Sequence, residues 1–278
     1  MKFFDRLTIV LFNICLLAVA IIFPALKIAS TPAYYHAQFE KNGIYAQVDE
    51  NGTERRTTIR YIGGNTDDRA TFSDAQLNEM IDHIVDYLFT DKASFALVMD
   101  GVMLNGTLTD NVNIFGETAV THMQDVKNLM TFAAQAAKIA AVAMAVLALY
   151  FLCRGKRIAK RLLTTTLGFY AVILLLAGAF FIWTYLATKN LGWGMEYFTT
   201  VLWRNVHYLF FPFQPEKLEG SFFNDTLTSI LTLELFMTAV IIVLAIWLVS
   251  LTVWLVIAAR IRKRIIRREE LFRRGRVY

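Results

Sequence analysis

Two of the four histidines in the sequence, His122 and His207, each lie close to a long apolar stretch. Imidazole has an unperturbed pKa of about 6.5, so a histidine can both accept and donate a proton near neutral pH. The sequence contains no GxSxG elbow, P-loop, HExxH or CxxC motif, each of which would indicate another chemistry. Proton transfer by a histidine pair is therefore one interpretation of these residues, although residue type and spacing alone do not favour it. The competing interpretation is that each histidine fills an amphipathic position at a membrane surface.

Three further residues are candidates to support the pair. Asp125 lies one helical turn after His122 and either orients an imidazole or is a solvated acid at the end of a helix. Arg204 and Glu234 are additional orienting or supporting candidates. His122 and His207 have no further His or Cys companions nearby. Because zinc sites need several such ligands, the sequence predicts no metal site, and no other cofactor is predicted.

The composition places these residues in a membrane protein. Hydrophobic residues make up 56% of the 278, and the mean hydropathy of +0.45 is too high for an ordinary soluble domain. A helix of about 20 apolar residues crosses a hydrocarbon core of about 30 Å. The first candidate span lacks a small-residue cleavage site, so it is predicted to be a retained anchor rather than a signal peptide. The four predicted spans are Leu7–Ala29, Thr131–Cys153, Leu162–Ala187 and Leu227–Ala259.

Positive charges predict the orientation of these spans. Sixteen of the 28 Lys and Arg residues lie in three short pieces, residues 1–6, 154–161 and 260–278. Because cytoplasmic flanks are rich in Lys and Arg, both termini are predicted to be cytoplasmic. Residues 30–130 hold seven basic and fifteen acidic residues, a net charge of −8, and are predicted to be extracytoplasmic. The basic tail favours contact with anionic membrane phospholipid over nucleic acid.

The acidic segment, residues 30–130, is predicted to be an α+β domain inserted between the first two spans. Asn51-Gly52 predicts a hairpin that joins Ile44–Val48 to Thr57–Ile62, and Asp100-Gly101 predicts a second hairpin. The arms of the second hairpin are Phe95–Met99 and Val102–Leu104.

A capping box at Ser73 and Gln76 predicts a helix between these hairpins, with apolar residues at helical spacing from Leu77 to Leu88. His83 falls on the polar face of this helix, and His36 lies in a polar stretch. Both are predicted to be solvated surface residues. A later helix is predicted to begin near Thr118 and to run without a break into the second span, because residues 117–154 contain no Pro or Gly.

The segment 188–226 is predicted to lie in the membrane interface. It contains eight aromatic residues between Gly192 and Phe213, with His207 among them. Two charges fall inside predicted spans, Lys138 in the second and Glu234 in the fourth. Buried charges in membranes are functional candidates. Lys138 either extends toward the interface or pairs with Glu234.

Two short motifs resemble those of a known family. The run His122–Lys127, HisMetGlnAspValLys, resembles the HisMet-x-AspValLys motif of the bacterial lipoprotein intramolecular transacylase (Lit) family, and His207–Phe211 resembles its His-x-x-PhePhe motif. The order of one anchor, an outer domain and three more spans is also similar. Asp225–Phe236 is similar to the following segment, but Leu233 stands where the family has proline before the acidic residue.

The resemblance implies an enzyme, an acyltransferase of the bacterial cell membrane with its active site at the outer leaflet. It implies a diacylated lipoprotein as substrate and transfer of the sn-2 acyl chain to the α-amine of its N-terminal cysteine, giving the lyso form. His122 and His207 would be the general acid and base, with the assignment between them open. The attacking amine belongs to the substrate, which agrees with the lack of a nucleophile motif in the sequence.

The expected organisation is an anchor (residues 1–29), the outer domain (30–130), spans two and three (131–187), the interfacial segment (188–226), span four (227–259) and the basic tail (260–278). The alternative function is a non-enzymatic sensor or assembly partner whose outer domain binds a peptide or protein. A transporter is disfavoured because the chain has no internal repeat. A phospholipid acyltransferase or hydrolase would need a nucleophile that no motif supplies. No feature of the sequence indicates the oligomeric state.

Overall fold

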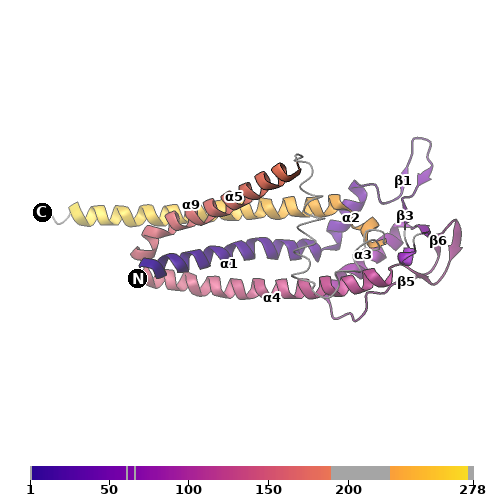
Figure 1. Cartoon of the computed structure of the whole chain (residues 1–278), viewed down its shortest axis with the longest axis horizontal. Coiled ribbons are helices and arrows are strands. Elements are labelled where there is room, and N and C mark those ends of the chain that lie inside the picture. The colour runs from indigo at the N-terminus through magenta and orange to yellow at the C-terminus, as the bar shows by residue number, and fades with distance from the viewer. Residues whose placement is uncertain (1, 61, 66, 189–225, 275–278) are drawn as a thin grey trace. The chain divides into compact units, whose positions relative to one another are not determined.

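Four long helices form the membrane part of the protein, in a computed structural model that describes residues 2–60, 62–65, 67–188 and 226–274. Within these residues, four helices are long and apolar enough to cross a membrane. They are α1 (Lys2–Ala29), α4 (Glu117–Arg154), α5 (Lys156–Thr188) and α9 (Leu233–Arg274) (Figure 1). The predicted fold class is confirmed, a membrane protein with four transmembrane helices and an α+β domain inserted between the first two.

The inserted domain is built from short elements that follow α1. Its helices are α2 (Pro32–Lys41), the 3₁₀ turn η1 (Ile62–Gly64) and α3 (Asp74–Phe89). Its strands in the first half are β1 (Gln47–Val48), β2 (Glu54–Arg55), β3 (Thr58–Arg60) and β4 (Arg69–Thr71). Those in the second half are β5 (Val98–Met99), β6 (Val102–Leu104), β7 (Thr107–Thr109) and β8 (Val112–Asn113).

The strands form a four-stranded antiparallel sheet in the order β3-β4-β6-β7 and two separate pairs, β1-β2 and β5-β8. The hairpin at Asn51-Gly52 is present, with Val48 opposite Glu54. Its predicted second arm was wrong, because Thr58–Arg60 pairs with β4 instead of with the strand before the turn. The short β2 closes the hairpin first, and the chain then joins the main sheet.

The second predicted hairpin was also wrong in its pairing. The chain does turn at Asp100-Gly101, but β5 pairs with β8 while β6 pairs with β4 and β7. The true hairpin joins β6 to β7 through Asn105-Gly106, both at positive φ. Asn-Gly favours this turn as strongly as it does at the first hairpin.

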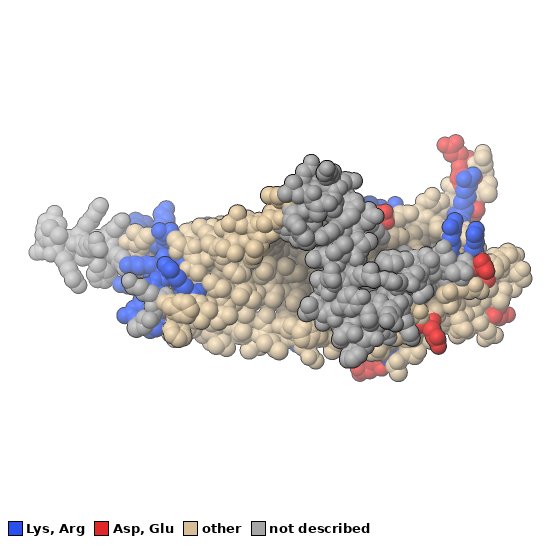
Figure 2. Space-filling view, in the orientation of Figure 1, with Lys and Arg blue, Asp and Glu red and all other residues tan. Residues whose placement is uncertain are grey.

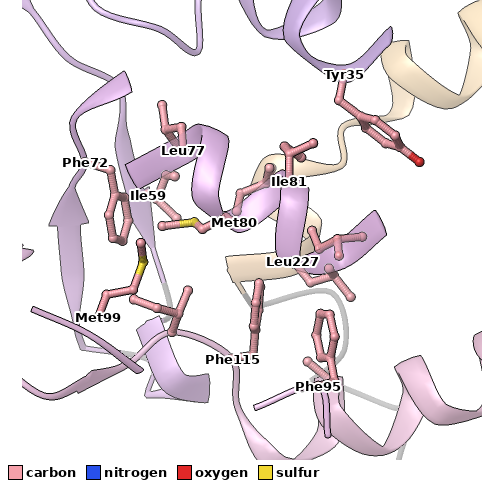
Figure 3. Packing of buried hydrophobic residues seen from close by; sticks show 14 of the residues in the cluster. Tyr35, Ile59, Phe72, Leu77, Met80, Ile81, Phe95, Met99, Phe115 and Leu227 are labelled. Atoms are coloured by element: carbon pink, nitrogen blue, oxygen red, sulfur yellow. The ribbon is translucent and has the colours of Figure 1, made fainter. Parts of the chain in front are cut away.

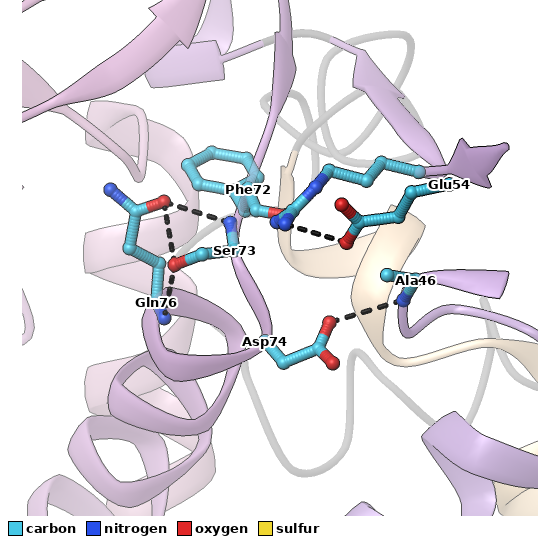
Figure 4. A network of polar contacts seen from close by, with 7 residues as sticks. Ala46, Glu54, Phe72, Ser73, Asp74 and Gln76 are labelled. Carbon is cyan, nitrogen blue, oxygen red and sulfur yellow. Dashed lines mark hydrogen bonds and ion pairs between the residues drawn. The ribbon is translucent and has the colours of Figure 1, made fainter. Parts of the chain in front are cut away.

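Helix α3 forms as predicted. The Ser73 hydroxyl accepts a hydrogen bond from the Gln76 backbone at 3.2 Å, and the Gln76 side chain accepts one from the Ser73 backbone at 2.9 Å (Figure 4). Beside this cap, the Asp74 carboxylate accepts a hydrogen bond from the backbone N–H of Ala46. Such a capping box stabilises a helix start by about 1 kcal/mol.

The apolar face of α3 forms the centre of the domain core. Met80 and Ile81 are fully buried there, together with Phe95, Met99 and other residues of the strands and loops (Figure 3). The short helix α8 (Thr226–Ile230) adds two more buried residues, Leu227 and Ile230, to this core. Each such side chain contributes roughly 1.5–3 kcal/mol through its removal from water.

The fourth span begins later than predicted. The predicted stretch starts at Leu227, but α8 ends at Ile230 and the spanning helix α9 starts at Leu233. The Thr226 hydroxyl donates a hydrogen bond to the Ile114 carbonyl at 2.7 Å, and Leu227 is buried in the domain core. Hydropathy alone could not separate these residues from the span because a domain core and a bilayer both select apolar side chains.

Two polar contacts join α1 to α5 inside the helical bundle. The Asn13 side-chain amide donates to the Thr166 hydroxyl at 3.1 Å, and both residues are fully buried. The buried Asp5 carboxylate lies 2.7 Å from the Arg161 guanidinium. Lys and Arg residues gather at the end of the bundle where α5 begins (Figure 2), and Arg161 lies in the second turn of α5.

Replacement of Thr166 with valine should loosen the bundle. The variant keeps the side-chain shape but removes the acceptor for Asn13, so we expect destabilisation of about 0.6–1.7 kcal/mol. Thermal unfolding of the purified protein in detergent measures this change. The control is Thr164→Val, because the exposed Thr164 hydroxyl bonds only within its own helix, to Arg161. Equal unfolding temperatures for the two variants would contradict the prediction.

Candidate functional site

The N-terminal turns of α4 carry His122 and are fixed in the domain by close packing. Gly116, directly before the helix, passes so near to η1 that a Cβ on it would lie 2.9 Å from the Gly63 carbonyl oxygen. The Gly116 carbonyl accepts the hydrogen bond of the Val120 N–H, in the first turn of the helix. Ala119 and Met123 are then buried in the domain core. The start of α4 is therefore set by glycine-to-glycine contact and by apolar burial.

His122 and Asp125 lie beyond the edge of the side of α4 that packs on the core. Successive residues of a helix are rotated by about 100°, so His122 is offset from the buried Met123 by about 100° and Asp125 by about 160° in the same direction. Both side chains are half-buried, and both take part in polar or ring contacts. The spacing of one turn thus places Asp125 beside His122, as the sequence predicts.

The structure describes only some of the other candidate residues. His207 and Arg204 lie outside the described residues, so their part in the site stays a prediction. Glu234 is exposed in the first turn of α9, and its backbone carbonyl accepts a hydrogen bond from Thr238. Lys138 is exposed on α4. A pairing of Lys138 with Glu234 also stays a prediction.

Polar contacts from α3 and the loop after it reach two residues of the run His122–Lys127 on α4. The Tyr87 hydroxyl donates to the side-chain oxygen of Gln124 at 2.8 Å. The Lys127 ammonium donates to the backbone carbonyl of Lys92 at 2.8 Å and lies 4.6 Å from the centre of the Tyr87 ring. A tyrosine hydroxyl is protonated near neutral pH and can donate, and burial raises the pKa of Tyr87 further. No pattern in the sequence indicates these contacts, although Lys127 belongs to the motif and Tyr87 lies in the last turn of α3.

His83 is buried, with only 7% of its surface exposed, which corrects its predicted place on the solvated face of α3. The segment after α3 folds back and packs Phe95 and Phe115 against the ring. His83 Nε2 donates to the Phe95 carbonyl at 2.8 Å, and Nδ1 accepts from the Lys92 ammonium at 2.9 Å. A carbonyl can only accept and an ammonium can only donate, so this ring is the neutral Nε2–H tautomer.

His36 is half-buried rather than solvated, which also differs from the prediction. Its Nδ1 lies 2.7 Å from the Tyr45 hydroxyl oxygen, and that hydroxyl donates to the Asn78 side chain. Burial is the main cause that raises the pKa of Tyr45, with nearby carboxylates including Asp74 adding to the effect. His36 is therefore part of the packing between α2 and α3.

The described part of the site offers acid–base chemistry. Within the described residues, no group of three or more His, Cys, Asp or Glu side chains comes together in a way that could hold a metal ion. Its functional groups are an imidazole and a carboxylate one turn apart on α4. This pair can transfer a proton, with the carboxylate able to orient the ring.

Comparisons with known proteins point to a single family. The profile of the family described as lipoprotein intramolecular transacylase Lit matches residues 7–212. Two solved structures resemble the chain, both of the membrane integral lipoprotein intramolecular transacylase Lit from Bacillus cereus. One is 14% identical, with coverage of 98% of this chain and 100% of that chain and a TM-score of 0.48. The other carries a histidine-to-arginine mutation and is 12% identical, with coverage of 96% and 94% and a TM-score of 0.52. At this identity the likeness concerns the fold alone. No curated protein matches the sequence.

The buried His83 should make the stability of the domain depend on pH. Burial, with help from the Lys92 charge, lowers the pKa of His83 below its ordinary value of 6.5, while the bond to Phe95 opposes the shift. The unfolded chain then binds more protons than the folded one below about pH 6.5, so stability should fall as the pH falls through the lowered pKa.

Unfolding temperatures of the full protein in detergent at pH 5.5 and 7.5 check this sign. The decrease on acidification should be smaller in His83→Gln, which cannot titrate. His36→Gln is the control, because it leaves the His83 contacts in place. An equal decrease in the wild type and in His83→Gln would refute the assignment.

Proposed function

Because the chain belongs to the lipoprotein intramolecular transacylase (Lit) family, we propose that it moves the sn-2 acyl chain of a diacylglyceryl lipoprotein to the α-amine of the N-terminal cysteine. The observation that carries the proposal is the extent of the family match. Residues 7–212 include both short motifs, and with them His122 and His207. A membrane location agrees with a lipid-bearing substrate, since four described helices can span a bilayer.

The reaction balances without water, metal or cofactor. The amine nitrogen attacks the ester carbonyl and forms the new C–N bond, and the tetrahedral intermediate then collapses with loss of the glyceryl oxygen. The proton that leaves the amine ends on that oxygen, which gives a lyso-lipoprotein with an N-acyl group. An α-amine has an ordinary pKa of about 7.7–8.0, so a base must keep it neutral during the attack.

In this proposal His122 and His207 share the proton transfers. One imidazole takes the proton from the amine, and the other assists at the carbonyl or donates to the glyceryl oxygen. Asp125, one turn from His122, orients an imidazole and stabilises its protonated form. Arg204 and Glu234 are further candidates for support at the oxyanion or the substrate. The aromatic residues around His207 would hold acyl chains at the membrane interface.

Replacement of either histidine should abolish most of the activity. General acid–base groups contribute about 10²–10⁴-fold to rates, so His122→Ala and His207→Ala should each slow acyl transfer at least a hundredfold. Mass spectrometry of the lipoprotein N-terminus distinguishes the diacylglyceryl form from the N-acyl lyso form. His36→Ala is a matched control, because it removes a histidine from the same chain outside the proposed site.

Full conversion to the N-acyl lyso product by both single variants would refute the histidine pair. A wild-type protein with no acyl transfer at all would favour the non-enzymatic sensor or assembly partner. Replacement of both histidines should not affect a binding module of that kind.

We also propose that the domain and the site face the outside of the cell membrane, with both termini in the cytoplasm. The concentration of basic residues at the bundle end where α5 begins supports this orientation (Figure 2). In a chain with Cys15 and Cys153 replaced, a cysteine at the exposed Val48 should react with an impermeant maleimide in intact cells. A cysteine at the exposed Arg157 should react only after permeabilisation. The opposite labelling pattern would reverse the orientation.

A further inference from the structure

We propose that Tyr87 and Lys127 are positioning residues that fix the rotation of α4 about its axis and thereby the direction of His122. This inference rests on the proposed role of His122 in acyl transfer. Neither residue is placed among the groups that would transfer protons. Both contribute through directional contacts between α3, the loop after it and the first turns of α4.

The need for such contacts follows from how α4 is packed. Ala119 and Met123 bury one side of the helix in the domain core, with Val120 and Val126 packed against it. Apolar burial stabilises the helix but has no preferred direction, so it tolerates small rotations of the helix on the core. Hydrogen bonds require a donor–acceptor distance of about 2.7–3.2 Å and near-linear geometry, so they restrict such rotations.

The two polar contacts act on one side of α4, away from His122. Gln124 and Lys127 are separated by about 60° around the helix, and Lys127 is offset from His122 by about 140°. Gln124 accepts the Tyr87 hydroxyl, and Lys127 donates to the Lys92 carbonyl. A rotation that moved the His122 ring would therefore stretch both contacts together. The same Tyr87 ring lies under the Lys127 ammonium at 4.6 Å, which links the two.

The partners of these contacts are themselves held firmly. Tyr87 is 1% exposed and packs against the ring of Phe95 at 5.2 Å between centroids. The loop that presents the Lys92 carbonyl is fixed on both sides of that residue. Thr90 bonds back to the Asp86 carbonyl, and His83 bonds both the Lys92 ammonium and the Phe95 carbonyl. Lys127 is thus bound to a fixed point of the domain rather than to a free loop.

The consequence for catalysis is geometric. A misplacement of about 1 Å in a reacting group can reduce a rate about a hundredfold even when the substrate still binds. Loss of the contacts should therefore reduce kcat and leave KM nearly unchanged. A residue that only stabilised the fold would instead reduce the amount of folded enzyme, with each folded molecule as active as the wild type.

The test compares kcat and KM per folded enzyme in detergent micelles, with a synthetic diacylglyceryl lipopeptide as substrate and mass spectrometry of the product. Tyr87→Phe keeps the ring but removes the hydroxyl, and Gln124→Ala removes the same hydrogen bond from an exposed position. Lys127→Met removes the ammonium, while Lys127→Arg keeps a donor and a charge that can lie over the ring. Asn128→Ala is the control, because among the described residues the exposed Asn128 side chain accepts a hydrogen bond only from Gln124 of the same helix and bonds to no group of α3 or the loop after it.

We expect Lys127→Met to lower kcat about tenfold or more with KM within twofold of the wild type. Tyr87→Phe and Gln124→Ala should lower kcat by similar factors to each other, Lys127→Arg should recover most of the loss, and Asn128→Ala should have no effect. Values of kcat within twofold of the wild type in Lys127→Met, Tyr87→Phe and Gln124→Ala would overturn the inference, provided that His122→Ala is inactive. An active His122→Ala would overturn the proposed function instead.

Discussion

The hydrocarbon core of a bilayer offers no hydrogen-bond partners, so a spanning segment must pair its own backbone polar groups. Helix α4 meets this constraint by running without interruption from Glu117 to Arg154. At 1.5 Å per residue, its 38 residues extend about 57 Å, well beyond the length that a hydrocarbon core of about 30 Å requires. The surplus turns are the ones that carry Ala119, Met123 and His122. The same helix therefore supplies a span, part of the domain core and the candidate catalytic histidine.

The α+β domain packs against the first turns of α4. Its own core, centred on α3, contains no recognised catalytic motif, yet it contacts α4 through both apolar and polar groups. Met123 supplies the apolar contact, and Gln124 and Lys127 supply the polar ones. Two of these motif residues, Met123 and Lys127, thus have structural partners within the domain. The motif combines residues that hold the helix with residues that would react.

Directional contacts have the same function within the bundle as within the domain. Apolar side chains on spanning helices pack against each other and against lipid with little difference in energy, so polar contacts add specificity to their packing. The bond from Asn13 to Thr166 and the pair of Asp5 with Arg161 fix α1 against α5. In the domain, the bond from Tyr87 to Gln124 fixes α3 against α4.

The sequence by itself determined the features that depend on local chemistry and on the bilayer. Four apolar stretches, the capping box at Ser73, the Asn51-Gly52 turn and the continuous helix through His122 were all predicted, because each depends on neighbouring residues or on segment length. The position of Asp125 one turn from His122 follows in the same way.

The tertiary structure decided what depends on distant parts of the chain. Strand pairing in the domain, the place of α8 in its core and the burial of His83 were not predicted correctly, because each results from contacts between segments far apart in sequence. The partners of Gln124 and Lys127 are of the same kind, since 37 and 35 residues separate them from Tyr87 and Lys92. Local patterns specify which residues form the helix that carries His122, but only the folded domain fixes how that helix is rotated.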